Sequence, residues 1–236
     1  IESVKDKEGN DLKVDVKLAD RNVKVKVWEV EVGRVKVFLL DTNIAENSEQ
    51  DKQLTSRLYG GGDETRIAQE IILGVGGTRA LYELGYDPVV WHMNEGHSVY
   101  LGLERIKDLM DDFDLDFDEA LETVAANSVF TTHTPVPAGN ESFSIDLKER
   151  YFSDYWESIG LTKEEFMALG YVNEEDSDEF GLTVLALRLA QFSNGVSELH
   201  GEVSSEMWED VWPEVPKKEN PIDYITNGIH TLTWLA

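Results

Sequence analysis

The sequence predicts an α/β fold, in which a mostly parallel sheet flanked by helices follows an antiparallel β meander. Apolar residues alternate with polar ones near the N-terminus, and helical periodicity dominates the rest of the chain. Short apolar runs that end in polar residues separate the helical segments, as strands do in such folds. We therefore place the meander at residues 1–45 and one α/β domain at residues 46–236.

The meander is predicted from the alternation between Leu12 and Leu40. Valine or leucine occupies every second position in three short segments, and "ADRN" and "VGR" supply the turns between them. A period of two is typical of antiparallel strands with one face in water. The polar stretch "DTNIAENSEQDKQ" that follows is predicted to be a loop.

The α/β domain begins with helical spacing from about Glu64. Apolar residues from Ile67 to Leu84 fall on one face and Gly85 ends the pattern, which predicts one long helix or two in tandem. The "GVGG" within it does not follow a strand or open a helix, as a dinucleotide-binding turn would. We attribute these glycines to close packing against a sheet or another helix.

The remaining elements follow from shorter patterns. "PVVWHM" and "SVFTTHT" read as buried strands, "DYITNGIH" has strand character, and helices are expected at about 98–110 and over "DFDEALETVAAN", capped by Asp116. Residues 150–215 are predicted to be mostly helical, including the run "EFGLTVLALRLAQFSNG".

Composition excludes several classes of function. The 47 acidic and 21 basic residues give a net charge of −26, which argues against nucleic acid or an anionic membrane as a partner. The absence of cysteine excludes disulfides, thiolate zinc sites and thiol nucleophiles, and fits a reducing cytoplasm. No stretch reads as a membrane span or a signal peptide, and the abrupt ends suggest a piece of a longer protein.

Polar residues end three of the predicted strands. Asn94, Glu95 and His97 follow the first strand, His133 follows the second between two threonines, and Asn227 follows the third. Because ligands bind at the carboxyl ends of parallel strands, we expect a site there. Helix capping would equally explain Asn94, and a turn stabilised by backbone hydrogen bonds would explain His133.

Two other kinds of site are not supported by the spacing. His92 lies in the predicted strand and His97 at the helix start, and no HExxH pair falls on one helical face, so we predict no metal site. "GHSVY" lacks the final glycine of the G-x-S-x-G turn that presents a serine nucleophile.

Five blocks of sequence, in this order, resemble the α-glucan phosphorylases, the enzymes of glycogen, starch and maltodextrin, and most of all their shorter bacterial and archaeal branch. The blocks are "LYGGGDETRIAQEIILGVGGTRALYELG", "WHMNEGHSVYLGLERI", "VFTTHTPVPAGNESF", "RLAQFSNGVSELHGEVSSEMW" and "ITNGIHTLTWLA".

The resemblance implies a GT-B architecture with two Rossmann-like halves, of which this chain supplies the later part of the N-terminal half. It also implies that inorganic phosphate cleaves a terminal α-1,4 bond of a glucan or maltooligosaccharide, giving α-glucose 1-phosphate. The resemblance further implies that the enzyme uses pyridoxal phosphate, which a lysine of the C-terminal half holds as a Schiff base. That lysine and the basic residues that bind phosphate are outside this chain, so we expect the chain alone to be inactive. Whether the protein forms a homo-oligomer is left open.

The resemblance also implies roles for particular residues. His133 matches the histidine whose imidazole lies near the primary hydroxyl of the reacting glucose, and Asn227 matches an asparagine that hydrogen-bonds the same sugar. Asn94, Glu95 and His97 match a group around the pocket beside that glucose.

Two further parts of the sugar site are implied. Gly195 and Val196 match a backbone segment that packs against the sugar. The loop from Tyr59 to Asp63 matches a mobile gate over the entrance, although its three consecutive glycines differ from the animal enzymes.

Two alternatives remain open. A GT-B glycosyltransferase that uses a sugar nucleotide would need a nucleotide site in the other half and no pyridoxal phosphate. A carbohydrate-binding or interaction module without catalysis would bind maltooligosaccharides by itself.

Overall fold

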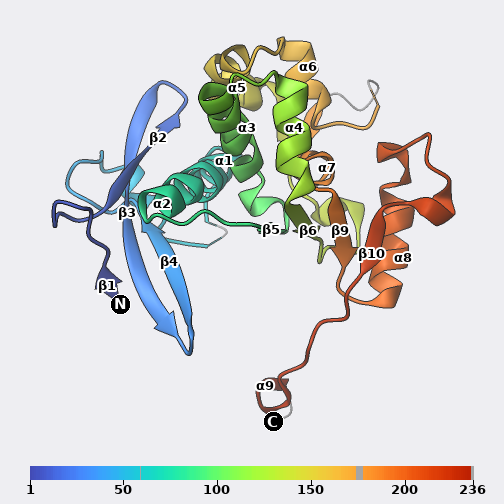
Figure 1. Cartoon of the computed structure of the whole chain (residues 1–236), viewed down its shortest axis with the longest axis horizontal. Helices are drawn as coiled ribbons and strands as arrows, with labels where there is room; N and C mark the ends of the chain where they lie inside the picture. The colour runs from blue at the N-terminus through green and yellow to red at the C-terminus, as the bar shows by residue number, and fades with distance from the viewer. Residues whose placement is uncertain (59, 174–177, 235–236) are drawn as a thin grey trace.

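The computed structural model describes residues 1–58, 60–173 and 178–234. It shows a mixed α/β fold with a parallel sheet and flanking helices, as predicted. An antiparallel sheet built from the first part of the chain lies at one side, and the parallel sheet with its helices forms the rest (Figure 1). None of the helices in the described ranges is long and apolar enough to cross a membrane.

The antiparallel sheet is organised around one long strand, β3. It pairs with β1 and β2 along one edge and with β4 along the other. The strands are β1 (Glu2–Ser3), β2 (Lys13–Leu18), β3 (Arg21–Val32) and β4 (Val35–Asp41). Gly33, at φ +63°, opens the two-residue turn between β3 and β4, a position that favours glycine in hairpins of this length. Alternate valines of β2 and β3 are buried, so one face of this sheet is part of the core.

A three-part helix packs on that buried face. It consists of α1 (Asp63–Ile71), a π-helical turn η2 (Ile72–Gly76) and α2 (Gly77–Glu83). Two of the three glycines of the "GVGG" stretch, Gly74 and Gly76, lie where the packing is closest. A Cβ on Gly74 would be 2.7 Å from the backbone nitrogen of Leu101, and one on Gly76 would be 3.1 Å from Cγ2 of Val16. The helix thus contacts a second helix through one glycine and the sheet through another, which agrees with the packing role expected for them.

The parallel sheet has the strand order β10-β9-β6-β5. Its strands are β5 (Trp91–Asn94), β6 (Ser128–Thr131), β9 (Phe192–Gly195) and β10 (Ile222–Tyr224). The prediction of a helical run over residues 179–195 is wrong at both ends, because Glu179–Gly181 form the short strand β8 and residues 192–195 form β9, which pairs with both β6 and β10. The side chains of Ser193 and Asn194 are buried within the sheet, so this strand lacks the apolar pattern that would identify it.

Helices cover the sheet and connect its strands. They are α3 (Tyr100–Phe113), α4 (Phe117–Ala126), α5 (Ile145–Ser158), α6 (Lys163–Ala168), α7 (Leu182–Arg188), α8 (Glu198–Met207) and the short α9 (Thr231–Trp234). A separate two-stranded antiparallel sheet pairs β7 (Ser142–Ser144) with β8 (Glu179–Gly181), on either side of α5 and α6 in the chain. The expected cap Asp116 begins α4 in a reciprocal capping box with Glu119. The segment that ends in α9 extends away from the body (Figure 1).

The core of the body contains one lysine. Lys148 of α5 is fully buried, and its ammonium lies 3.8 Å from the ring centroid of Phe180 and 3.9 Å from that of Phe152. Nζ also donates a 3.1 Å hydrogen bond to the hydroxyl of Tyr100. Burial lowers the pKa of Lys148 well below its ordinary value. The aromatic rings stabilise the charge, but the site is closed to solvent.

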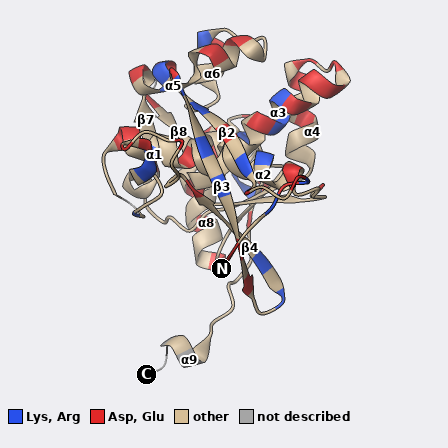
Figure 2. Ribbon diagram, turned by 90° about the vertical axis from the view of Figure 1, so that its left-hand side faces the viewer, with Lys and Arg blue, Asp and Glu red and all other residues tan. Residues whose placement is uncertain are grey.

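Charge is divided unevenly between the two parts of the fold. Residues 1–41 contain nine basic and nine acidic residues, whereas residues 42–236 contain 12 basic and 38 acidic ones. The whole net charge of −26 therefore belongs to the part that follows β4. Lysines are prominent on the strands of the antiparallel sheet and acidic residues on the helices of the body (Figure 2).

Candidate active site at the carboxyl edge of the parallel sheet

The loops that follow β5 and β6 enclose a cavity of about 520 Å³. Three residues predicted for the site line it, namely Glu95, His97 and His133. Four side chains that the sequence did not single out also line it: Arg66, Asn140, Glu141 and Thr183. Polar groups that follow two of the strands, β5 and β6, thus meet in one cavity, together with groups from α1, α7 and the loop that follows β6.

Glu95 determines the shape of this edge. Its backbone is in the left-handed region at φ +63°, which is uncommon for a residue with a side chain. Its Oε1 accepts hydrogen bonds from the backbone nitrogen of His133 and, at 3.1 Å, from the hydroxyl of Thr134. Glu95 therefore ties the end of β5 to the loop after β6. One of its carboxylate oxygens is already occupied, and the exposed imidazole of His133 is left facing the cavity.

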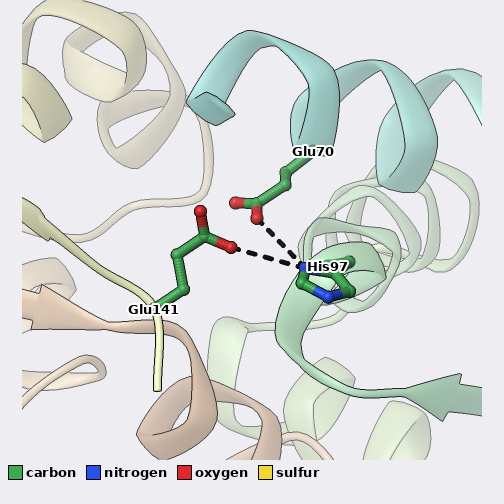
Figure 3. Close-up of side chains that lie close together, drawn as sticks. All are labelled: Glu70, His97 and Glu141. Carbon is green, nitrogen blue, oxygen red and sulfur yellow. Dashed lines mark hydrogen bonds and ion pairs between the residues drawn. The ribbon is translucent and has the colours of Figure 1, made fainter. Parts of the chain in front are cut away.

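The second polar group of the cavity is an ion network around His97 (Figure 3). Nδ1 of His97 lies 3.4 Å from Oε1 of Glu70 and 3.4 Å from Oε2 of Glu141. The guanidinium of Arg66 binds both oxygens of Glu141, at 2.8 and 2.7 Å, and contacts Glu70 at 3.3 Å. Such a two-pronged arginine–carboxylate pair fixes the orientation of both side chains. Arg66 and Glu70 come from α1, Glu141 from the loop before β7.

The network shifts the pKa values of its members in opposite directions. Hydrogen bonds to Glu141 and Glu70 raise the pKa of His97 to about 9. Burial raises the pKa of Glu70 to about 8, against the lowering effect of His97. Burial also acts to raise the pKa of Glu141, but its hydrogen bonds to His97, Glu70 and Arg66 outweigh that effect and hold this pKa far below its usual range. At neutral pH the imidazolium therefore faces one carboxylate and one carboxyl group that retains its proton.

The same three residues are also a geometric candidate for a cation site. One ligand atom from each of Glu70, His97 and Glu141 lies within 4.8 Å of the others. The guanidinium of Arg66 already binds both acidic side chains, and protonated His97 is a second cation between them. A metal ion would have to displace these positive charges, so the residues fit an ion network better than a metal centre.

The other predicted residues lie outside the cavity lining. Asn94 ends β5 with an exposed side chain, and Asp63 is the exposed first residue of α1. Tyr59 is outside the described residues. Asn227 is exposed, and its backbone nitrogen donates to the carbonyl of Val196 at 3.1 Å, so its segment continues along the end of β9. The strand itself ends earlier, at Tyr224.

Gly195 and Val196 connect β9 to α8 through a close contact. A Cβ on Gly195 would lie 2.7 Å from the backbone nitrogen of Gly201 and 2.8 Å from Nδ1 of His200. The backbone nitrogen of Val196 donates to that Nδ1 at 3.2 Å. Their local role is therefore to allow the helix to begin directly beneath the strand end.

Sequence reasoning missed Arg66, Glu70 and Glu141 because the pair on α1, one helical turn apart, meets Glu141 and His97 only in the folded chain. One signal was present for Glu70. It follows Ile67 by three residues and precedes Ile71, so an acidic residue interrupts the apolar stripe of a helix. A buried charged group of this kind is rare unless it has a partner.

The fold and the cavity together define an α/β protein with a polar candidate site at the carboxyl edge of a parallel sheet. Residues 69–236 match the profile of the carbohydrate phosphorylases. The chain belongs to this carbohydrate phosphorylase family.

Similar proteins agree with this assignment. The chain is 44% identical over 227 residues to the maltodextrin phosphorylase of Thermococcus litoralis, covering 96% of this chain and 26% of that protein. It is 44% identical over 243 residues to the glycogen phosphorylase of Mycobacterium tuberculosis, covering 98% and 28%. It is 40% identical over 236 residues to the glycogen phosphorylase of Aquifex aeolicus, covering 100% and 34%. The chain thus spans between a quarter and about a third of the length of these relatives.

Proposed function

We propose that this chain forms the saccharide-facing side of the active site of an α-1,4-glucan phosphorylase. The observation that carries the proposal is the cavity in which His133, Glu95 and His97 meet. Family membership and relatives named glycogen and maltodextrin phosphorylase support the reaction class. In this reaction inorganic phosphate cleaves the terminal bond of a glucan and releases α-glucose 1-phosphate.

The cavity chemistry suits a neutral polyol. Imidazole, amide, hydroxyl and carboxylate groups from His133, Asn140, Thr183 and Glu95 converge there, and each can pair with a sugar hydroxyl. A buried polar group left unpaired costs roughly 1 to 3 kcal/mol, so such a lining selects ligands that satisfy it. Within the proposal, the imidazole of His133 is placed next to a hydroxyl of the reacting glucose.

Glu95 acts on His133 through the backbone. The carboxylate that accepts the His133 amide hydrogen also holds Thr134, so the loop carrying the imidazole is fixed on both sides of its peptide unit. We infer that Glu95 is a positioning residue, and that His97 and its carboxylate partners form the rigid wall beside it. Rigid support of this kind lowers the cost of ordering a catalytic group.

The cofactor implied by the family does not fit the residues described here. Among the described residues that line the cavity, Arg66 is the only lysine or arginine, and it is bound to Glu141. Lys148 is enclosed by aromatic rings in the core and cannot reach the cavity. We therefore assign pyridoxal phosphate, like the phosphate-binding groups, to a C-terminal half outside this chain and derive no step through it. We also propose that this half completes the GT-B architecture and that the chain alone is therefore inactive. The proposed location of the whole protein is the cytoplasm.

The test uses an enzyme that contains both halves. His133→Ala should lower kcat/KM at least about tenfold, on the order of 1.4 kcal/mol of transition-state stabilisation. His92→Ala is the matched control, because His92 lies on β5 outside the cavity and hydrogen-bonds Thr131. An unchanged kcat/KM for His133→Ala would remove this histidine from the site.

A binding experiment on the chain alone distinguishes the proposal from the alternative of a carbohydrate-binding module without catalysis. A binding module without catalysis predicts that the 236-residue chain binds maltooligosaccharides in calorimetry with full affinity. The proposal predicts much weaker binding, because only one side of the saccharide would be contacted.

A further inference from the structure

A separate cavity lies where the turn between β2 and β3 meets η2, α3 and α5. Its volume is about 250 Å³, and its described lining residues do not include any that line the candidate active site. Its buried wall is formed largely by apolar and aromatic side chains, of which Ile71 is 2%, Phe152 4% and Tyr151 8% exposed. The wall therefore offers a contact surface for an aromatic group, which buries much apolar area for its size.

The rim of this cavity carries an excess of positive charge. Three of the 12 basic residues in the acidic part of the chain, residues 42–236, line it, together with one lysine of β2. Among the described lining residues, these four cationic side chains outnumber the two carboxylates. In a body of high negative charge, an anion is attracted to such a place rather than repelled from it. The cationic side chains are those of Lys17, Arg79, Lys107 and Arg150, and the carboxylates are those of Glu104 and Asp154.

The ion pairs at the rim allow exchange. Lys17 binds Asp154 and Arg150 binds Glu64, and each partner in these two pairs is more than half exposed. Exposed ion pairs add little stability, so the charged group of a ligand can replace either carboxylate at little cost. Arg79 differs because its partner is a buried carboxylate. We therefore expect Lys17 and Arg150, rather than Arg79, to meet a bound anion.

The turn between β2 and β3 contributes a strained residue to this cavity. Ala19 has φ +52° and is the first residue of a two-residue turn, a position that favours glycine. It is also one of the residues that line the cavity. Backbone strain of this kind is concentrated at binding sites, where the surrounding structure holds the strained residue in place. The turn is thus a second indication, independent of charge, that the cavity is a site.

The volume of the cavity limits the size of its ligand. At about 30 Å³ for each water molecule, a cavity of about 250 Å³ has the volume of roughly eight waters, which suits a molecule of about ten non-hydrogen atoms. Two exchangeable cations suit the double charge of a phosphate group.

We propose that this cavity binds a small organic anion, whose aromatic ring contacts the apolar wall and whose phosphate group contacts Lys17 and Arg150. The site is independent of the proposed function, because the cavity around His133 is lined by other residues.

Titration calorimetry of the 236-residue chain with phenyl phosphate tests the site. The expected Kd is below about 1 mM, whereas inorganic phosphate and phenol, which each carry one half of the probe, should bind at least about tenfold more weakly. If phenyl phosphate did not bind at about 10 mM, or if inorganic phosphate bound equally well, the proposal would be overturned.

A matched pair of variants tests the cationic rim. Lys17→Ala should raise the Kd of phenyl phosphate at least about fivefold, because one of the two exchangeable cations is lost. Lys24→Ala is the control, since Lys24 also forms an exposed ion pair, with Asp15, and is not among the described residues that line the cavity. Equal Kd values for the two variants would show that the anion does not contact Lys17, which contradicts the proposal.

A second pair tests the apolar wall from η2. Val75→Phe fills part of the cavity and should raise the Kd of phenyl phosphate at least about tenfold. Leu73→Phe changes a position that is 47% exposed and outside the described lining, so the Kd should stay the same. Thermal unfolding shows whether each variant is folded, and the Lys17→Ala comparison decides the question if Val75→Phe is not. Unchanged binding by a folded Val75→Phe variant would overturn the proposed contact.

Discussion

The two sheets of this protein differ in almost every physical respect. The antiparallel sheet is built from consecutive strands and carries no net charge. The parallel sheet is built from strands far apart in sequence, belongs to the part with all of the net charge, and holds the cavity at its carboxyl edge. Pairing between strands that are consecutive in the chain is enough to form the antiparallel sheet. The cavity, by contrast, depends on pairing between strands that are distant in the chain, because only that pairing brings the loops after β5 and β6 together.

The helix between the two sheets offers the largest test of this comparison. Gly74→Ala should lower the free energy of unfolding by about 3 kcal/mol, because the new Cβ would meet the backbone of α3 at 2.7 Å. Gly76→Ala should cost less, since the nearest atom belongs to the side chain of Val16, which can adjust. Urea denaturation measures both.

Gly77 is the control for these two variants. Its helical backbone has open space around the position of a Cβ, so Gly77→Ala should stabilise the chain by about 0.5 to 1 kcal/mol. If Gly76→Ala proved more damaging than Gly74→Ala, the contact with the antiparallel sheet would be the tighter one.

The second test concerns the pH dependence of the network at the cavity. The folded-state pKa of His97 is raised from 6.5 to about 9, so its contribution to stability is complete below pH 6.5 and is lost as the pH rises through 9. The raised pKa of Glu70 acts in the same direction, with its contribution lost through about pH 8. Stability from this network should therefore fall between pH 7 and 9.5.

Thermal unfolding of a matched pair of variants isolates the effect. Glu70→Gln should make the fall in Tm over that interval smaller by about 3 °C, the shift expected for roughly 1 kcal/mol in a chain of this size. His92→Gln, outside the network, should keep the full fall. An unchanged fall in Glu70→Gln would show that Glu70 is ionised in the folded protein throughout.

The smallest effect tests the division of charge. Glu122→Lys on α4 should stabilise the chain by about 0.3 kcal/mol at low salt, because it relieves repulsion within the acidic body. Glu8→Lys, in an exposed turn of the neutral sheet, should have no such effect. The difference should vanish at about 0.5 M salt, where screening removes long-range interactions. Equal effects of the two reversals would mean that the charge division has no energetic consequence.

The elements that could be predicted are those whose pattern is local. The alternation in β2 to β4 and the helical stripe of α1 depend on neighbours in sequence, and the cap Asp116 bonds within its own turn. β9 was missed because it is a central strand whose buried residues include the polar Ser193 and Asn194, and no local apolar pattern marks it. The assignment of residues 46–236 to one domain stays a prediction.

The candidate site was predictable to the same extent. Glu95, His97 and His133 stood out because each follows a strand directly. Glu70 and Glu141 join them only through the packing of α1 against the loop after β6, which brings together residues 71 positions apart along the chain. Family likeness could supply roles for residues, but the ion network becomes visible only when the side chains are placed.

The π-helical turn at η2 makes the cavity sensitive to where the chain length changes. A π turn contains one residue more than an α-helical turn, so deleting a residue between Ile72 and Gly76 would restore a regular helix and leave α1 and α2 in nearly the same relative orientation. A deletion within α2 would instead rotate α1 by about 100° relative to the residues that follow. Arg66 and Glu70 would then move away from His97, although none of the three had been replaced. The wide turn is thus the place in this helix where evolution can add or remove a residue without disturbing the pocket.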